Sequence, residues 1–204
     1  VLSQTSQGHL EQWVPIVVDC YCLGRSFRRV TQATNRHVPE FLHLEVEWVG
    51  VLTLDELTSR VRTFIINLIT NFRSSAHSYL TELGVDMDID LSCPILDYTP
   101  ECETPTQLSL ILNPPRSANS FDLKPGMAVD VVVPVMGEIM GCGIREYDVD
   151  SLAHAILASG KTLDEYSEYL SLRAMGHGRT AGFGLGVDRL LAWLLNKSDI
   201  RDVL

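Results

Sequence analysis

The sequence predicts an α+β fold, in which a mainly antiparallel β-sheet is flanked by helices. Two strand-like segments, 20–28 and 41–49, follow each other with no helix between them, which favours an antiparallel pair. After a long helical pattern, further strand patterns at 107–112, 127–135 and 138–146 come before the last helices. This order of two strands, a helix, more strands and then helices is typical of the α+β class.

The segment 41–49 has the clearest strand period. Its side chains alternate between two faces, with Leu42, Leu44, Val46 and Trp48 on one and Phe41, His43, Glu45 and Glu47 on the other. The polar loop that precedes it, residues 29–40, is long for a connection between paired strands. A loop of this kind between two strands suggests a functional role.

The strongest helix signal begins with a T-x-x-E capping box at Thr53. The apolar residues after it fall on one helical face, so we expect one amphipathic helix that runs to about residue 82. Residues 84–106 are acidic and have little period of either kind, which predicts an irregular segment. Shorter helices are expected at 9–18 and after a second capping box at Thr162.

The stretch TAGFGLGVDRLLAWLL, residues 180–195, places a glycine at every second position and then an Asp-Arg pair. Because side chains alternate along a strand, glycines with this spacing would leave one face open to a flat ligand. We expect a central strand here and a helix that begins at or near Val187. A helix N-terminus favours anions, and Arg189 adds a permanently charged guanidinium to it.

The composition excludes some classes of function. The 204 residues carry a net charge of −10, from 16 basic and 26 acidic side chains, so the chain is a poor general binder of nucleic acid. No apolar run approaches the roughly 18 residues of a membrane span, and no leader pattern opens the chain, so we expect no membrane partner. The five cysteines have no zinc-site spacing, which favours core thiols in a reducing compartment.

Several stretches together resemble the class II aminoacyl-tRNA synthetases. The segment 27–41 resembles motif 2 of that family, and the glycine turn with Asp188 and Arg189 resembles motif 3. MGEIMGCGIREYD (136–148) is similar to a Gly-Glu-Ile segment with a downstream arginine in the aspartate and asparagine branch. LSQTSQGHLE (2–11) resembles the substrate-contacting turn upstream of motif 2. Within the family, the resemblance is closest to the asparaginyl-tRNA synthetases of the archaeal and eukaryotic cytosolic kind.

This resemblance implies a site for ATP. Arg28 would hold the α-phosphate and Arg189 the γ-phosphate, and the two would stabilise the charge that develops when a carboxylate attacks the α-phosphate. Phe41 would stack under the adenine. The other implied ATP contacts are Arg36, His37, Gly184 and Gly186.

The resemblance also implies a metal and an amino-acid substrate. Asp130 and Glu138 would bind Mg²⁺, for which one or two protein carboxylates and the ATP phosphates suffice. Two solvated acids beside a turn are the alternative interpretation of this pair. Gln7 and Arg145 would hold asparagine or aspartate, with the arginine contacting its carboxylate or side-chain end.

Some positions depart from the family pattern. Val30 stands where motif 2 has a glutamate that recognises adenine, and Asp122 stands in place of an aromatic wall. The stretch 73–112 is shorter than the family pattern. These departures favour an alternative to a ligase that charges tRNA, namely a degenerate paralogue that acts as a structural or regulatory subunit of a larger complex. A third possibility is a stand-alone amino-acid ligase, which would keep the ATP and amino-acid sites without the tRNA-binding barrel.

The domain organisation follows from the same resemblance. Residues 1–204 are expected to form a partial catalytic domain, without motif 1 and without the β-barrel that binds the anticodon. The chain would then bind tRNA only together with those parts. A homodimer or a place in a larger assembly is expected, in the cytoplasm or in the mitochondrion.

Overall fold

The structure is a computed structural model that describes residues 2–30, 34–85, 88–115, 120, 122–176 and 178–204. It contains one seven-stranded sheet, whose strands lie in the order β1-β2-β7-β6-β5-β4-β3. Neighbouring strands are antiparallel except β3 and β4, which are parallel. The strands are β1 (Asp19–Phe27), β2 (Glu40–Val49), β3 (Ile95–Asp97), β4 (Ser109–Leu112), β5 (Leu123–Val133), β6 (Gly137–Arg145) and β7 (Thr180–Gly186).

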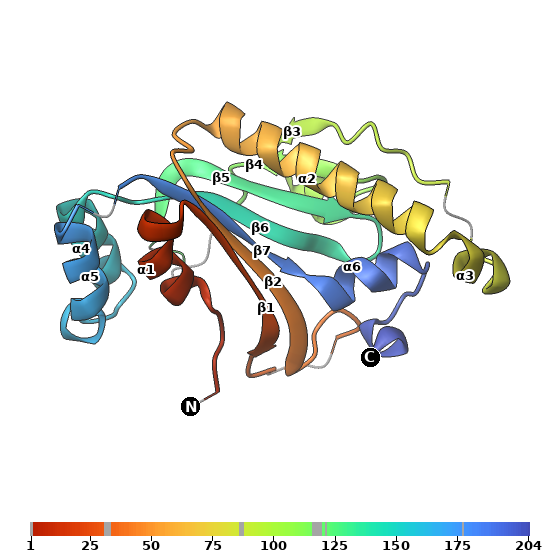
Figure 1. Ribbon diagram of the computed structural model, residues 1–204, viewed down its shortest axis with the longest axis horizontal. Coiled ribbons are helices and arrows are strands. Elements are labelled where there is room, and N and C mark those ends of the chain that lie inside the picture. The colour runs from red at the N-terminus through yellow and green to blue at the C-terminus, as the bar shows by residue number, and fades with distance from the viewer. Residues whose placement is uncertain (1, 31–33, 86–87, 116–119, 121, 177) are drawn as a thin grey trace.

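Helices flank this sheet, so the predicted α+β fold with a mainly antiparallel sheet is confirmed. In Figure 1, α2 runs across one face of the sheet, while α4 and α5 lie together at one end. The helices are α1 (Gln7–Val17), α2 (Leu54–Ser75), α3 (His77–Glu82), α4 (Val149–Ala158), α5 (Ser167–Ala174) and α6 (Val187–Leu194), with short 3₁₀ turns η1 (Pro100–Glu103), η2 (Asp164–Tyr166) and η3 (Ile200–Val203). None of the helices in the described ranges is long and apolar enough to cross a membrane.

The hydrophobic core lies between α2 and the sheet. The buried face of α2 consists of residues spaced by three or four, including Leu57, Val61 and Ile65, which is why this amphipathic segment folds as a helix. Its first turn is capped as the sequence predicts, since the Thr53 hydroxyl accepts the Glu56 N–H. Phe183 of β7 enters this core, with its ring centroid 4.9 Å from that of Phe64 on α2.

Two expectations about residues 53–106 are wrong. The helix does not continue to residue 82, because Ala76 leaves the helical conformation and separates α2 from α3. Because neither glycine nor proline marks this break and the helical period continues past it, the sequence does not reveal where α2 ends. The irregular segment contains β3 and η1, and β3 has only three residues, all exposed, which leaves no alternation to detect.

The last part of the chain follows the predicted order. The glycine stretch forms β7 between β2 and β6, at the centre of the sheet, and α6 begins at Val187. The capping box at Thr162 is present, and its helical segment starts with η2 and continues as α5. Helix α4 is an additional element that the sequence analysis did not anticipate.

Candidate functional site

Two adjoining cavities open on the side of the sheet that the β7 glycines face. The first has a volume of about 360 Å³ and the second of about 670 Å³. Arg28, His43, Glu138 and Gly184 line both of them, so the cavities share a wall. The first is also lined by Val30, Arg36, His37, Phe41, Gly186 and Arg189, and the second by Gln7, Glu45, Glu47, Asp122, Asp130 and Arg145.

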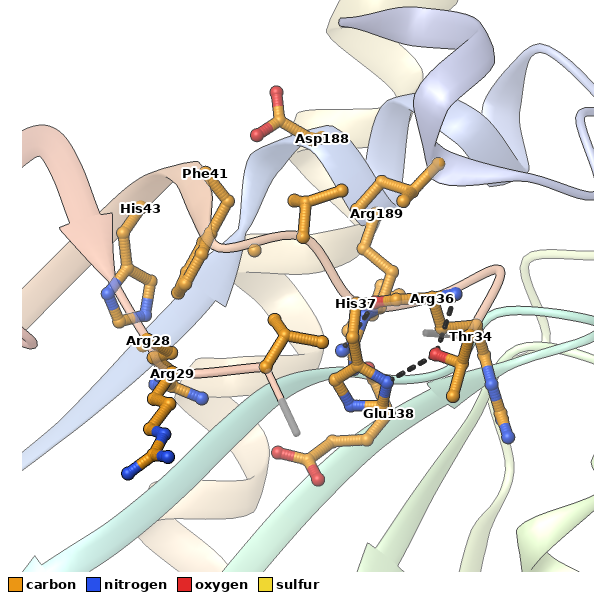
Figure 2. A pocket seen from close by; sticks show the side chains of 16 residues that line it. Arg28, Arg29, Thr34, Arg36, His37, Phe41, His43, Glu138, Asp188 and Arg189 are labelled. Carbon is orange, nitrogen blue, oxygen red and sulfur yellow. Dashed lines mark hydrogen bonds between the residues drawn. The ribbon is translucent and has the colours of Figure 1, made fainter. Parts of the chain in front are cut away.

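The first cavity is lined by positive charge on two sides. Figure 2 shows Arg28, Phe41 and His43 on one side, and Arg36, His37 and Arg189 on the other. The Arg28 guanidinium lies 5.1 Å from the centroid of the Phe41 ring, at the distance of a cation–π contact. The Arg28 N–H bonds the Pro39 carbonyl at 2.9 Å, so pairing of β1 with β2 continues up to this arginine.

Arg189 joins three segments of the chain at the first turn of α6. Its guanidinium donates to the Arg36 carbonyl at 3.0 Å and to the Glu138 carbonyl. Burial lowers the pKa of Arg189; the charges of Arg36 and Arg28 lower it further, and Glu138 opposes them. A bound anion would offset the repulsion between these arginines, which makes the cavity a suitable site for phosphate groups.

Hydrogen bonds and close packing hold the residues around Arg189 in place on this side of the first cavity. Asp188 accepts the Leu42 N–H at 2.7 Å, which ties the start of α6 to β2. Arg36 packs on Gly137, where a Cβ would lie 2.7 Å from Nη1. The Nδ1 atom of His37 lies 2.6 Å from the Thr34 hydroxyl. Burial lowers the pKa of His37, and the three arginines lower it further, so its ring is neutral at physiological pH.

The polar side of β2 faces the same cavities. His43 is buried, with Nδ1 3.0 Å from the Ser26 hydroxyl and 3.5 Å from a Glu45 carboxylate oxygen. Burial lowers the pKa of His43, an effect that Glu45 opposes and Arg28 reinforces. Glu45 also accepts the Ser6 N–H at 2.7 Å, so it holds the chain that leads into α1.

The glycines of β7 make room for these β2 side chains. A Cβ at Gly184 would lie 2.5 Å from His43 Nε2, and one at Gly182 would overlap the Glu47 carboxylate and the Val46 carbonyl oxygen. The face cleared at these two positions is therefore occupied by the protein's own side chains. The expected face is therefore partly filled, by His43 over Gly184 and by Glu47 over Gly182, although Gly184 and Gly186 still line the first cavity.

Arg145 is the centre of a buried ionic cluster in the second cavity. Glu47 accepts from Nε at 3.0 Å and from Nη2 at 2.9 Å, and Asp122 accepts from Nη1 at 2.8 Å. Burial alone would lower the pKa of Arg145, but Glu47 and Glu11 hold it well above its usual value. Burial raises the pKa of Glu47, and the charge and hydrogen bonds of Arg145 oppose that rise.

Gln7 and Glu11 extend this cluster into α1. The Gln7 amide donates to Asp122 at 2.8 Å and to Glu11 at 2.6 Å. Glu11 in turn pairs with Arg173 of α5 and accepts the Tyr169 hydroxyl at 2.7 Å. Burial and the nearby Glu11 carboxylate raise the pKa of Tyr169 well above its usual value, so the phenol remains a donor. The cluster thus connects α1, β2, β6 and α5.

Asp130 and Glu138 lie on neighbouring strands, β5 and β6, and both line the second cavity. Asp130 is buried, whereas Glu138 is exposed and also reaches the first cavity. Among the described residues, no group of three or more His, Cys, Asp or Glu side chains could hold a metal ion. A divalent cation at this pair would need further oxygen ligands, which phosphates can supply.

The profile of the family described as tRNA synthetases class II (D, K and N) matches residues 1–204. The chain belongs to this family.

Relatives of this class II synthetase chain include ligases for asparagine. The chain is 29% identical to the cytoplasmic asparagine–tRNA ligase of Debaryomyces hansenii over 98% of its own length and 44% of the relative's. It is 27% identical to the asparagine–tRNA ligase of Thermococcus kodakarensis, over 98% and 55%. The chain therefore spans about half the length of the curated relatives it matches. The first alignment extends over 242 positions, more than the 204 residues here, so the relative has residues without a counterpart.

Solved synthetase structures share the fold. Asparaginyl-tRNA synthetase from Pyrococcus horikoshii, complexed with asparaginyl-adenylate, superposes with a TM-score of 0.86 at 25% identity, over 99% of this chain and 55% of that one. The corresponding Entamoeba histolytica complex also has a TM-score of 0.86, at 23% identity and with the same coverage. The predicted class II synthetase fold is thus confirmed.

The structure brings the implied synthetase residues together in two groups. Those assigned to ATP line the first cavity: Arg28, Arg36, His37, Phe41, Gly184, Gly186 and Arg189. Those assigned to the amino acid and the metal line the second: Gln7, Arg145, Asp130 and Glu138. Their roles remain predictions.

Sequence reasoning missed the acidic partners of Arg145 and the place of His43. A signal for two of them, Glu47 and His43, was present, because they alternate with Glu45 along one face of β2, and buried polar residues with a period of two indicate a lined cavity. Glu11 gave no such signal. It lies on a helix and meets Arg173, 162 residues away, only in the folded chain.

Proposed function

We propose that this chain is the catalytic part of an asparaginyl-tRNA synthetase-like ligase, which uses ATP to activate asparagine, or aspartate, for transfer to tRNA. One observation carries the proposal: a cavity lined by arginines adjoins a polar cavity, and the two share Arg28, His43, Glu138 and Gly184. A single ligand that contacts these four shared residues would reach both cavities. The relatives named asparagine–tRNA ligases, and the neighbour that binds asparaginyl-adenylate, support this choice.

In the proposed reaction, a carboxylate oxygen of the amino acid attacks the α-phosphorus of ATP. The bond from that phosphorus to the bridging oxygen breaks, and pyrophosphate leaves with the electron pair. Arg28 would stabilise the charge that develops on the α-phosphate, and Arg189 would hold the γ-phosphate. Phe41, which lines the first cavity beside Arg28, would stack on the adenine. Arg36 and His37 would meet the outer phosphates, and Gln7 and Arg145 the amino acid.

Magnesium is proposed at Asp130 and Glu138. Both carboxylates line the cavity that adjoins the arginines, and oxygen donors are the ligands that Mg²⁺ prefers. When bound, Mg²⁺ would neutralise charge on the phosphate oxygens. The residues of the chain would orient the phosphates around it, Arg28 and Arg189 from opposite sides.

We assign residues 1–204 to one catalytic-domain unit. The relatives are about twice as long, so we infer that anticodon recognition is a property of other parts of such ligases. The cytoplasmic relatives favour the cytoplasm over the mitochondrion. A homodimer or a place in a larger assembly remains part of the same proposal.

The test is the binding of Mg-ATP and the exchange of pyrophosphate. Mg-ATP should raise the melting temperature as RT ln(1 + [L]/Kd) predicts, and asparagine should then support exchange of pyrophosphate into ATP. Arg28→Ala should lower the exchange rate by about two to three decades, as for the loss of one transition-state contact. No stabilisation by millimolar Mg-ATP would contradict the proposal.

A second candidate is a degenerate paralogue with a structural or regulatory role. It is favoured by the Asp122 carboxylate on Arg145, and by Val30, which cannot accept a hydrogen bond from adenine in the first cavity. Retained ATP binding without exchange for any amino acid would support this candidate. Because Val30 removes a contact to the base, weak discrimination between ATP and GTP is expected in either case.

A further inference from the structure

Asp122 contacts both residues that are proposed to hold the amino acid. A single oxygen, Oδ2, accepts from Gln7 Nε2 at 2.8 Å and from Arg145 Nη1 at 2.8 Å. A carboxylate of the chain thus occupies donors that would otherwise meet an acidic ligand. Asp122 also lines the second cavity, so it lies where a ligand can reach it.

The charges around Arg145 do not balance. Its one positive charge serves both Glu47, through two hydrogen bonds, and Asp122, through one. Glu11 pairs with Arg173 on the far side of the cluster and also lies 3.6 Å from Arg145 Nε, so three carboxylates share two guanidinium groups. The side chain of Glu47 is 1% exposed and that of Asp122 is 15% exposed. The excess negative charge therefore faces the cavity at Asp122.

We propose that Asp122 determines specificity: it makes this end of the cavity a site for an ammonium or amide N–H₂ group and closes it to a carboxylate. The proposal deepens the proposed function and rests on it, since it assumes that this cavity holds the amino acid. A ligand carboxylate at this end of the cavity would lie beside Asp122 and Glu47, which already share the hydrogen bonds of Arg145, and neighbouring like charges repel strongly. A ligand group that donates a hydrogen bond to Asp122 is instead attracted by the excess negative charge of the cluster.

The test uses three amino acids whose side chains have similar lengths but different terminal groups. L-2,4-diaminobutyrate, L-asparagine and L-aspartate end in an ammonium, an amide and a carboxylate, respectively. Binding to the whole chain is measured by calorimetry at about pH 7.5, where the ammonium is charged and the carboxylate ionised. Diaminobutyrate should bind most tightly, asparagine next, and aspartate about tenfold or more weaker than asparagine, as for one mismatched charge.

Two variants of Asp122 then separate charge from shape. Asp122→Asn should bring aspartate to within about threefold of asparagine and weaken diaminobutyrate, because the charge is lost. Asp122→Glu should keep the wild-type order, and this variant also decides the question if Asp122→Asn does not fold. Glu45→Gln is the matched control, since it removes a carboxylate from the same cavity but not from the contacts of Arg145.

The proposal is overturned if aspartate binds as tightly as asparagine, if Asp122→Asn leaves the three affinities in the same ratio, or if none of the probes binds. The proposal is also overturned if Glu45→Gln changes the ratios of the three affinities as much as Asp122→Asn does. The general electrostatic field of the cavity, and not the contact with Asp122, would then be the cause. These measurements contain no nucleotide. A failure of ATP binding or of exchange contradicts the proposed function, and the order of the three affinities does not depend on it.

Discussion

The carboxylate of Glu47 lies over Gly182 of the neighbouring strand while both of its oxygens accept hydrogen bonds from Arg145. This arrangement leaves no room for a side chain at residue 182, since the backbone carbonyl of Val46 limits the space as well.

Gly182→Ala should therefore destabilise the protein by about 1–3 kcal/mol, the usual cost of overpacking, because Glu47 must move off Arg145. Gly8→Ala is the control. Nothing lies within 4 Å of a Cβ at Gly8 in α1, and its effect should be neutral or stabilising by up to about 1 kcal/mol. Urea unfolding measures both. Equal stabilities of the two variants would show that the space over Gly182 is not filled by Glu47.

His43 should account for the cost of a side chain at Gly184. A Cβ there would lie 2.5 Å from Nε2, the far end of a side chain. Gly184→Ala should cost about 1–3 kcal/mol in the wild type and clearly less in a His43→Ala background, where the ring is absent. A double-mutant cycle of unfolding free energies measures this coupling. Additive effects would exclude the imidazole as the obstacle.

Acidification should destabilise the protein through His43. Burial lowers its folded-state pKa below the usual 6.5, so the unfolded chain binds this proton first as the pH falls. Stability from the neutral ring is fully present above about pH 6.5 and is lost as the pH falls toward the folded-state pKa.

His43→Gln should accordingly lose less stability than the wild type between about pH 7 and pH 5, as measured by melting temperature. His9→Gln changes an exposed histidine of α1 and serves as the control, with a pH profile parallel to that of the wild type. Parallel profiles for His43→Gln and the wild type would contradict the prediction.

Asp188 should stabilise the junction of α6 with β2. Asp188→Ala leaves the Leu42 N–H without its 2.7 Å acceptor and should cost about 1–3 kcal/mol. Because Leu42 adjoins Phe41, stabilisation by Mg-ATP should also decrease. Asp202→Ala removes an exposed carboxylate in η3 and should change neither quantity. Thermal melts with and without Mg-ATP test both effects.

Arg189→Lys should weaken Mg-ATP binding although the charge is kept. The guanidinium bridges the carbonyls of Glu138 and Arg36, and an ammonium lacks the planar fork that makes this bridge and that would contact phosphate in the proposed site. A loss of about 1.5–3 kcal/mol, the value of a charged hydrogen bond, corresponds to roughly ten- to hundredfold in Kd. The same change at Arg201, an exposed residue near the C-terminus, should leave Kd unaltered. Calorimetric titration decides between them.

Local patterns in the sequence predicted most of the fold. The alternation at 41–49 and the capping box at Thr53 placed β2 and the start of α2, because each depends on residues close in the chain. The break at Ala76 and the three-residue β3 depend on packing with distant segments, and no local residue marks them.

The site divides in the same way. The arginines of the first cavity stand in recognisable motifs, so their gathering could be anticipated. The pairing of Arg145 with its acids could not, because the alternation along β2 places Glu47 on a polar face without linking it to an arginine 98 residues away, and Glu11 belongs to a helix of ordinary composition. The glycine spacing predicted a cleared face correctly as geometry, but only the fold shows that His43 and Glu47 fill part of it.

The shared wall also sets a thermodynamic rule for the two proposed ligands. Arg28, His43, Glu138 and Gly184 face both cavities, so a nucleotide that repositions any of them changes the affinity for the amino acid. Linkage requires the reverse effect to have the same size: the amino acid changes the affinity for the nucleotide by the same factor. Binding of either ligand can then raise the affinity for the other by positioning the shared residues. The free energy of forming the ternary complex is the same whichever ligand arrives first.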